Sequence, residues 1–166
     1  AYHSFVIQPP PDASELVQAE LPFSKTDINV KFVPDLAPYR TIKVRILNGA
    51  HTSMVPLGHL LGLETVREAV THPQLGAFIR ALLVENVSPT MDLPEDEKAA
   101  FIEDTLLRFQ NPLIKHKLLS IALNSSTKFV TRLQPSMLDY VAVRGELPAH
   151  IVLAFAGLIR FYKGEW

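Results

Sequence analysis

The sequence contains no cysteine, which excludes disulfides, thiolate metal sites and a cysteine nucleophile. Its formal net charge is only -1, so charge gives no reason to expect nucleic acid or an anionic membrane surface as a partner. Seven glycines are present, and none forms a G-x-G-x-x-G or P-loop pattern, so we expect no dinucleotide site within this chain alone. The longest apolar stretch, 151–159, is about half of the roughly 20 residues that a membrane span needs. A cytoplasmic protein without a membrane segment is therefore expected.

The composition is that of a folded protein, with 166 residues of which 48% are hydrophobic and 20% charged. Residues 1–36 differ from the rest, because Phe5–Ile7 and Ile28–Phe32 are β-prone and the second alternates apolar with polar side chains. Neither run has an obvious partner in the chain, and isolated strands usually pair with something. We therefore expect them to belong to a sheet whose other strands lie outside this sequence.

From Pro38 onward the pattern is helical. Apolar residues recur at steps of three and four, and prolines repeatedly stand where a helix can begin, since a first helical residue needs no N–H partner. These signals predict a mainly α fold with helices near 40–62, 64–71, 73–88, 94–109, 112–123, 135–143 and 148–163.

The first long helix carries three polar residues that are able to do chemistry, Lys43, Asn48 and His51. At about 100° per residue, Asn48 lies about 140° and His51 about 80° from Lys43, so one helix directs all three into one sector. A lysine buried beside apolar neighbours becomes a usable acid or base, an asparagine amide donates to a developing alkoxide, and a histidine orients a hydroxyl. Spacing alone leaves the alternative open that these are surface residues, with Asn48-Gly49 as a kink or helix end.

The motif Lys43-x4-Asn48-x2-His51 resembles the signature of the polyol-specific long-chain dehydrogenases, the mannitol dehydrogenase family. The resemblance extends over nearly the whole chain, and its flanks are most similar to members that act on hexuronates. It is carried by residues 38–52, 109–116, 118–124, 127–129 and 160–165. It implies the multi-helical C-terminal domain of that family, of the type seen in the C-terminal domain of 6-phosphogluconate dehydrogenase.

The resemblance also implies roles for four residues. Lys43 would be the general acid/base and Asn48 part of an oxyanion-stabilising site, while His51 and Lys128 would contact the substrate. Ser120 stands where many polyol-acting members have an arginine, which fits a different substrate such as a uronate.

A hexuronate carboxylate should meet a cation, and Lys115, His116 and Arg132 are equal candidates. No metal is expected, because the resemblance implies a metal-independent enzyme and neither His59 nor His72 has metal-ligand spacing from His51.

The implied reaction is reversible hydride transfer between NAD(H) and a hexuronate, interconverting tagaturonate and altronate. NAD would be bound mainly by a missing N-terminal Rossmann domain of the same protein. We accordingly expect residues 1–36 to be the tail of that domain and residues 37–166 to be the helical substrate and catalytic domain, truncated at its C-terminus. Such a fragment would be inactive alone. Fructuronate reduction, a mannitol-type dehydrogenase and a non-catalytic helical interaction module remain alternatives.

Overall fold

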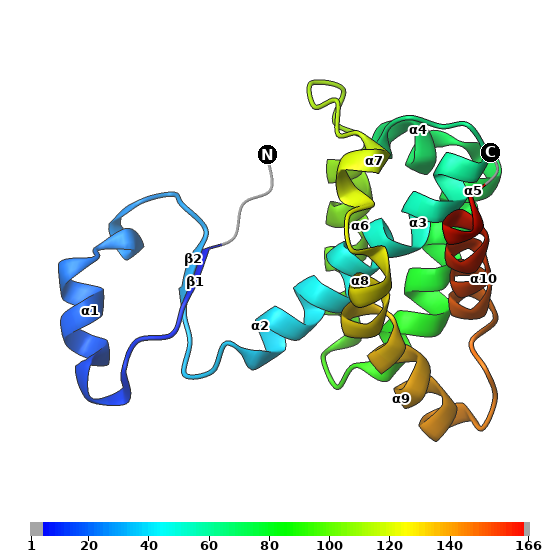
Figure 1. The fold of residues 1–166 in the computed structure, drawn as a ribbon. Helices are drawn as coiled ribbons and strands as arrows, with labels where there is room; N and C mark the ends of the chain where they lie inside the picture. Colours follow the sequence, from blue (N-terminus) through cyan, green and yellow to red (C-terminus); the bar gives the residue numbers. More distant parts are fainter. Residues whose placement is uncertain (1–4, 165–166) are drawn as a thin grey trace. The chain divides into compact units, whose positions relative to one another are not determined.

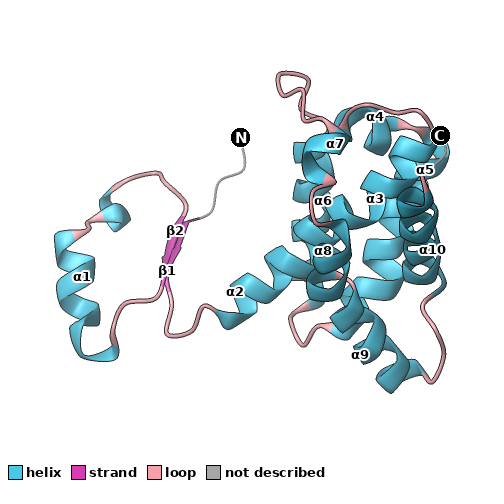
Figure 2. Cartoon of the chain, viewed as in Figure 1, coloured by secondary structure: helices cyan, strands magenta, loops and turns pink. Residues whose placement is uncertain are grey.

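The computed structural model describes residues 5–164 and divides into two compact units, Ala1–Thr41 and Ile42–Trp166 (Figures 1 and 2). The division falls five residues after the boundary expected from the sequence. Residues 1–4 and 165–166 of the expected domain ranges lie outside the described residues. Each unit has its own local structure and is treated separately below.

The first unit contains two short parallel strands, β1 (Phe5–Ile7) and β2 (Val30–Phe32), with helix α1 (Ser14–Glu20) between them in the sequence. The strands pair in register, with Val6 opposite Lys31. A parallel pair needs a long connection, and the segment containing α1 supplies it. The sequence showed no obvious partner for either strand, because pairing between distant segments leaves no local signal, and the structure shows that each is the other's partner. That further strands of the same sheet lie outside this sequence stays a prediction.

The second unit is helical and is organised around one long segment. This segment consists of a π-helical turn at Lys43–Asn48 and α3 (Gly49–Leu60), and it follows α2 (Ala37–Ile42), which belongs to the first unit except for Ile42. The helices that follow are α4 (Val66–Thr71), α5 (Pro73–Ala81), α6 (Glu95–Phe109), α7 (Leu118–Ile121), α8 (Ser125–Arg132), α9 (Gln134–Arg144) and α10 (Ala149–Lys163). None of the helices within residues 5–164 combines the length and apolarity needed to cross a bilayer.

Helix α3 runs through the middle of this unit, and α10 packs extensively along it (Figure 1). The apolar positions spaced by three and four in the sequence, including Ile46, Ala50 and Met54, are completely buried. The two helices approach closely because Gly157 has no side chain: a Cβ there would lie 2.5 Å from Leu57 Cδ2. The helical periodicity of the sequence therefore marks the core correctly, and the core fixes the helix that carries the candidate site.

Most predicted helix starts are confirmed. Pro73 is the first residue of α5, and Pro94 and Pro148 directly precede α6 and α10. At α4, Thr65 and Glu68 form a capping box in which each side chain accepts from the other's backbone N–H.

The predicted helix at 112–123 was wrong except at α7, because residues 111–117 form a loop. The Asn111 side chain accepts from the Leu113 N–H at 3.0 Å, which turns the chain away from a helix. Residues 116–118 are then held extended against 64–66, through Val66 N–H to His116 O at 2.9 Å and Leu118 N–H to Glu64 O at 2.8 Å. Helix α8, which lies outside all the predicted helices, begins at Ser125.

Candidate functional site

The turn that carries Lys43 and Asn48 is π-helical, and these two residues are its first and last. The Gly49 N–H donates to the carbonyl oxygen of Val44, five residues earlier, as π-helical geometry requires. One extra residue per turn brings residues five apart closer to the same face than α-helical geometry does. The turn therefore reduces the separation of about 140° that an ideal α-helix would give this pair.

The side chains of this pair differ in exposure. Lys43 is exposed, so the apolar burial that the sequence led us to expect around it is absent. The Asn48 side chain is half-buried, and the backbone carbonyl oxygen of Asn48 accepts a hydrogen bond from the Thr52 hydroxyl at 2.8 Å. Lys43 thus lies at the accessible end of the segment, and Asn48 lies nearer the core.

Arg45 fixes the π-helical turn to two other elements. Its Nη1 donates to the carbonyl oxygen of Thr90 at 3.0 Å and to the Thr90 hydroxyl at 3.1 Å, and it lies 2.6 Å from Asp139 Oδ2 on α9. Sequence analysis did not identify this role. The partners lie 45 or more residues away, so no local pattern marks them.

His51 follows on α3 and packs between two other rings. Its ring centroid lies 4.3 Å from that of Phe109 at the end of α6 and 5.3 Å from that of His116 in the 111–117 loop. Its Nε2 is buried and has no hydrogen-bond partner among the described residues. A buried polar atom without a partner is uncommon, which makes His51 a candidate for binding a group that this chain does not itself supply.

Burial, with a smaller contribution from nearby positive charge, lowers the pKa of His51 from 6.5 to about 3. The groups that contribute this repulsion are, in decreasing order, His116, Arg132, Arg108 and Lys128. His51 is therefore a neutral imidazole at physiological pH, surrounded by groups that favour an anion.

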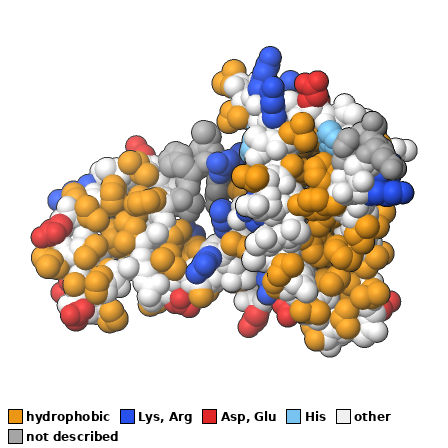
Figure 3. Space-filling view, in the orientation of Figure 1, with side chains coloured by type: hydrophobic (Ala, Val, Ile, Leu, Met, Phe, Trp, Pro, Cys, Tyr) orange, Lys and Arg blue, Asp and Glu red, His pale blue; other side chains and the backbone are white. Residues whose placement is uncertain are grey.

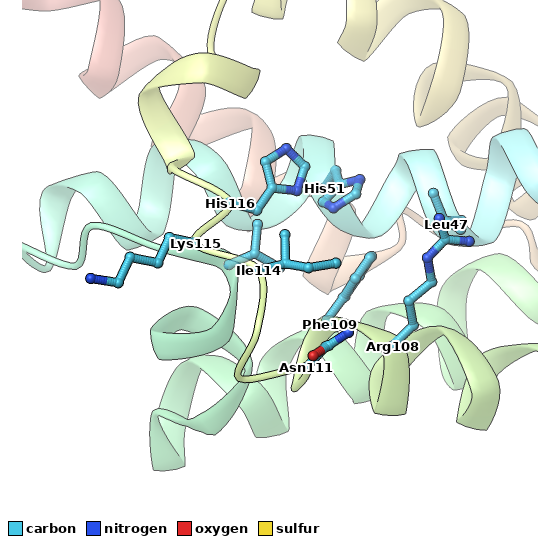
Figure 4. A pocket seen from close by; sticks show the side chains of 9 residues that line it. Leu47, His51, Arg108, Phe109, Asn111, Ile114, Lys115 and His116 are labelled. Carbon is cyan, nitrogen blue, oxygen red and sulfur yellow. The ribbon is translucent and has the colours of Figure 1, made fainter. Parts of the chain in front are cut away.

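A half-open pocket of about 410 Å³ lies beside His51 (Figure 4). It is lined by Leu47, His51, Val66, Arg108, Phe109, Asn111, Ile114, Lys115 and His116. The lining contains apolar, amide and basic side chains and no carboxylate. Lys43, Asn48 and Lys128 are not part of it.

Lys128 lies half-buried on α8, where its Nζ donates to the carbonyl oxygen of Ile121 at 2.7 Å. Burial lowers its pKa, the charge of Arg132 lowers it further, and Tyr162 opposes the shift. The structure thus places Lys128 within electrostatic range of His51, although the two side chains belong to different helices.

The structure separates the three cations considered for a carboxylate. His116 contacts the ring of His51, whereas the Lys115 side chain points away from both imidazoles (Figure 4). Arg132 instead lies 3.4 Å from the Thr52 hydroxyl, outside the pocket lining. Sequence analysis missed Arg108, whose only local signal is its place directly before the 109–116 segment.

No group of three or more histidine or acidic side chains within the described chain is arranged to hold a metal ion.

Comparison with known proteins identifies a protein family that the chain matches. A family model described as the mannitol dehydrogenase C-terminal domain matches residues 35–165. The altronate oxidoreductase of Yersinia enterocolitica is 48% identical over 164 residues, which is 99% of this chain and 33% of that protein. The altronate oxidoreductase of Bacillus subtilis is 45% identical, over 97% of this chain and 32% of that protein. The chain therefore spans about a third of the length of these curated relatives.

Two solved structures are similar to the chain. Mannitol 2-dehydrogenase of Pseudomonas fluorescens, in a ternary complex with NAD and D-mannitol, matches with a TM-score of 0.75 and 28% identity, covering 82% of this chain and 28% of that one. A substrate-free D-sorbitol dehydrogenase matches with a TM-score of 0.80 and 21% identity, covering 99% of this chain and 32% of that one. The second match concerns the fold alone.

Proposed function

The chain belongs to the mannitol dehydrogenase C-terminal domain family, and on that premise we propose that it is the helical substrate domain of a hexuronate oxidoreductase. The mainly helical fold and the family expected from the sequence are confirmed. The proposed substrates are tagaturonate and altronate, because relatives named altronate oxidoreductase are 45–48% identical over nearly the whole chain.

The proposed protein is longer than this chain and contains a nucleotide-binding domain. The curated relatives are about three times as long, and the chain offers no glycine-rich phosphate loop of its own. We assign NAD to that other domain, as the mannitol 2-dehydrogenase neighbour was solved with NAD. When bound, the nicotinamide supplies or accepts the hydride. On this proposal, residues 1–36 are the end of the nucleotide-binding domain and residues 37–166 are the substrate domain.

The residues of this chain would handle the proton and the oxygen. Lys43 protonates the ketone oxygen during reduction and removes the alcohol proton during oxidation. Asn48 donates to the same oxygen as negative charge develops on it, and His51 and Lys128 bind hydroxyl groups of the substrate. The observation that carries this proposal is the π-helical turn that begins at Lys43 and ends at Asn48, directly before His51. Such turns occur frequently at functional sites.

The test is hydride transfer by the full-length enzyme, followed by NADH absorbance, with tagaturonate, fructuronate and mannitol as the panel. We expect tagaturonate and altronate to be the preferred pair, and Lys43→Met to lower kcat by about 10²–10⁴-fold. The control is Lys163→Met, which removes an exposed lysine at the end of α10 and should leave kcat unchanged. A Lys43→Met enzyme with full activity would rule out Lys43 as the acid/base.

A second candidate function, a helical interaction module, is favoured by one observation. Apolar side chains are exposed on α9 and α10, and hydrophobic atoms gather over this part of the surface in Figure 3. They include Leu138, Val143, Leu153, Phe155, Ile159 and Tyr162. This function predicts a full-length protein that transfers no hydride to any member of the panel and loses partner binding when Phe155 and Ile159 are replaced by serine.

A further inference from the structure

The pocket beside His51 carries positive charge that no acidic side chain balances. Arg108, Lys115 and His116 line it, and none of them forms an ion pair with a carboxylate among the described residues. By contrast, Arg45 and Arg80 each pair with an acidic residue. The chain as a whole has a formal net charge of -1, so this excess is local to the pocket. A concave site with unbalanced positive charge attracts an anionic group.

The pocket has the form of a binding site as well as the charge. Phe109 and His51, with ring centroids 4.3 Å apart, form one wall of the pocket, and the uncharged imidazole adds no charge repulsion against a basic neighbour. Arg108 comes from the end of α6 and His116 from the 111–117 loop, so basic groups from two separate elements line the pocket on either side of His51 (Figure 4). An arginine fork matches the two oxygens of a carboxylate.

We propose that this pocket binds the carboxylate of the sugar acid, with Arg108 and His116 as the residues that distinguish an acidic sugar from a neutral one. This inference rests on the proposed function, since it names the recognition site for the substrate class. It selects His116 from the three cations that the sequence left open and adds Arg108, which the sequence did not indicate. Lys115 is left out because its side chain points away from the imidazole pair.

The position of the pocket also orients the substrate. α-Helical rise places Asn48 about 4.5 Å from His51 along the axis, and Lys43 lies beyond Asn48 at the other end of the π-helical turn. With its carboxylate at the His51 end, a hexuronate lies along α3 with its ketone directed towards Asn48 and Lys43. The acid group is thereby kept away from Lys43, which must donate its proton to the ketone and not form an ion pair.

The experiment titrates the 166-residue chain with D-tagaturonate, its neutral counterpart D-tagatose, and NAD, and follows the imidazole NMR signals of His51 and His116. NAD is included because a phosphate group is the other common anion that an arginine and a histidine bind. The variants are Arg108→Gln and His116→Gln. The control is Arg144→Gln, an exposed arginine in the last turn of α9. In parallel, KM for tagaturonate is measured in the full-length enzyme carrying the same substitutions.

We expect tagaturonate to shift both imidazole signals and tagatose not to. Loss of a charge-assisted hydrogen bond should raise the dissociation constant and KM for tagaturonate about ten- to a hundredfold in Arg108→Gln, with a smaller rise in His116→Gln and none in Arg144→Gln. Equal shifts by tagaturonate and tagatose, or Arg108-dependent shifts by NAD alone, would overturn the inference. An unchanged KM for tagaturonate in Arg108→Gln, found together with an inactive Lys43→Met enzyme, would also overturn the inference. It would leave the proposed function intact, because Lys43 would still be required for hydride transfer. Arg108-dependent binding of tagaturonate together with a fully active Lys43→Met enzyme would support the carboxylate site and contradict the proposed role of Lys43 as the acid/base.

Discussion

The Gly49 N–H donates to the carbonyl oxygen of Val44, so the helix that carries the candidate site has a π-helical turn directly before its most buried part. Lys43 and Asn48 are the two ends of that turn. Because π-helical geometry is less favourable than α-helical geometry, contacts elsewhere must stabilise it. Arg45 provides such contacts with Thr90 and Asp139.

Replacing Arg45 by lysine should loosen the π-helical turn. A lysine keeps the charge but loses the guanidinium geometry that reaches the Thr90 carbonyl, the Thr90 hydroxyl and Asp139 together. We expect amide hydrogen exchange at residues 43–49 to accelerate about tenfold, as one net hydrogen bond is lost. Arg40→Lys, an exposed position on α2, is the control and should leave exchange unchanged. Equal exchange in wild type and Arg45→Lys would show that the turn does not depend on this contact.

The helical part of the fold was predictable where local signals agree with packing. Periodic apolar residues such as Ile46 and Met54 are buried as expected, and Pro73 begins a helix as expected. The segment 111–117 has helix-like composition, but bonds from His116 and Leu118 to the start of α4 keep it extended. Those partners are some 50 residues away, so tertiary contacts override a preference that the sequence shows locally.

The sequence proposed candidate residues without showing how they lie together. Lys43, Asn48 and His51 belong to a single motif, and their resemblance to a family signature singled them out together with Lys128. The convergence of His51 with Arg108 and His116 depends on how α3, α6 and the following loop pack, which spacing does not reveal. The π-helical turn was missed because a 3.6-residue period was assumed throughout.

Lys98 should matter to stability far more than its acidic partner. Its side chain is 3% exposed, and Nζ donates to the carbonyl oxygens of Ser88 and Met91, both at 3.2 Å. Lys98→Met leaves both oxygens without this donor and should lower the free energy of unfolding by about 2–3 kcal/mol. Glu95, which lies 2.6 Å from Nζ, is 84% exposed, so Glu95→Gln should cost about 1 kcal/mol or less. Urea unfolding of both variants gives the comparison, and equal losses would contradict the assignment to the carbonyl contacts.

Gly76 should not tolerate a methyl group, although it lies in a helix where alanine is normally preferred. A Cβ at this position would overlap the carbonyl oxygen of Val70 and lie 3.2 Å from its carbonyl carbon, and a backbone atom cannot move aside as a side chain can. Alanine would favour the helix by about 1 kcal/mol. We nevertheless expect Gly76→Ala to lower the free energy of unfolding by about 1–3 kcal/mol. Gln74→Ala, at an exposed position of the same helix, serves as the control and should change it by about 0.5 kcal/mol at most. A stabilised Gly76→Ala variant would mean that α4 and α5 separate easily.

His51 should make the stability of the chain depend on pH in the mildly acidic range. Its pKa is about 3 in the folded chain and 6.5 when free, so between these values the unfolded state binds more protons than the folded state. The free energy of unfolding should therefore fall as the pH decreases below about 6.5, and His51 should contribute a slope of up to about 1.4 kcal/mol per pH unit. Above about pH 6.5 the titration of His51 should not change the free energy of unfolding.

The carboxylates also titrate in acid, so the contribution of His51 has to be isolated by comparing wild type with His51→Gln. The variant lacks the titrating ring. The difference in free energy of unfolding between wild type and His51→Gln, measured by urea unfolding, should therefore narrow or reverse from about pH 7 to about pH 5. An imidazole signal of His51 that titrates near 6.5 in the folded chain would show instead that its surroundings accept positive charge. In that case the ring would already have an anionic neighbour, and the unbalanced charge around the pocket would be less than the arrangement of Arg108, Lys128 and Arg132 indicates.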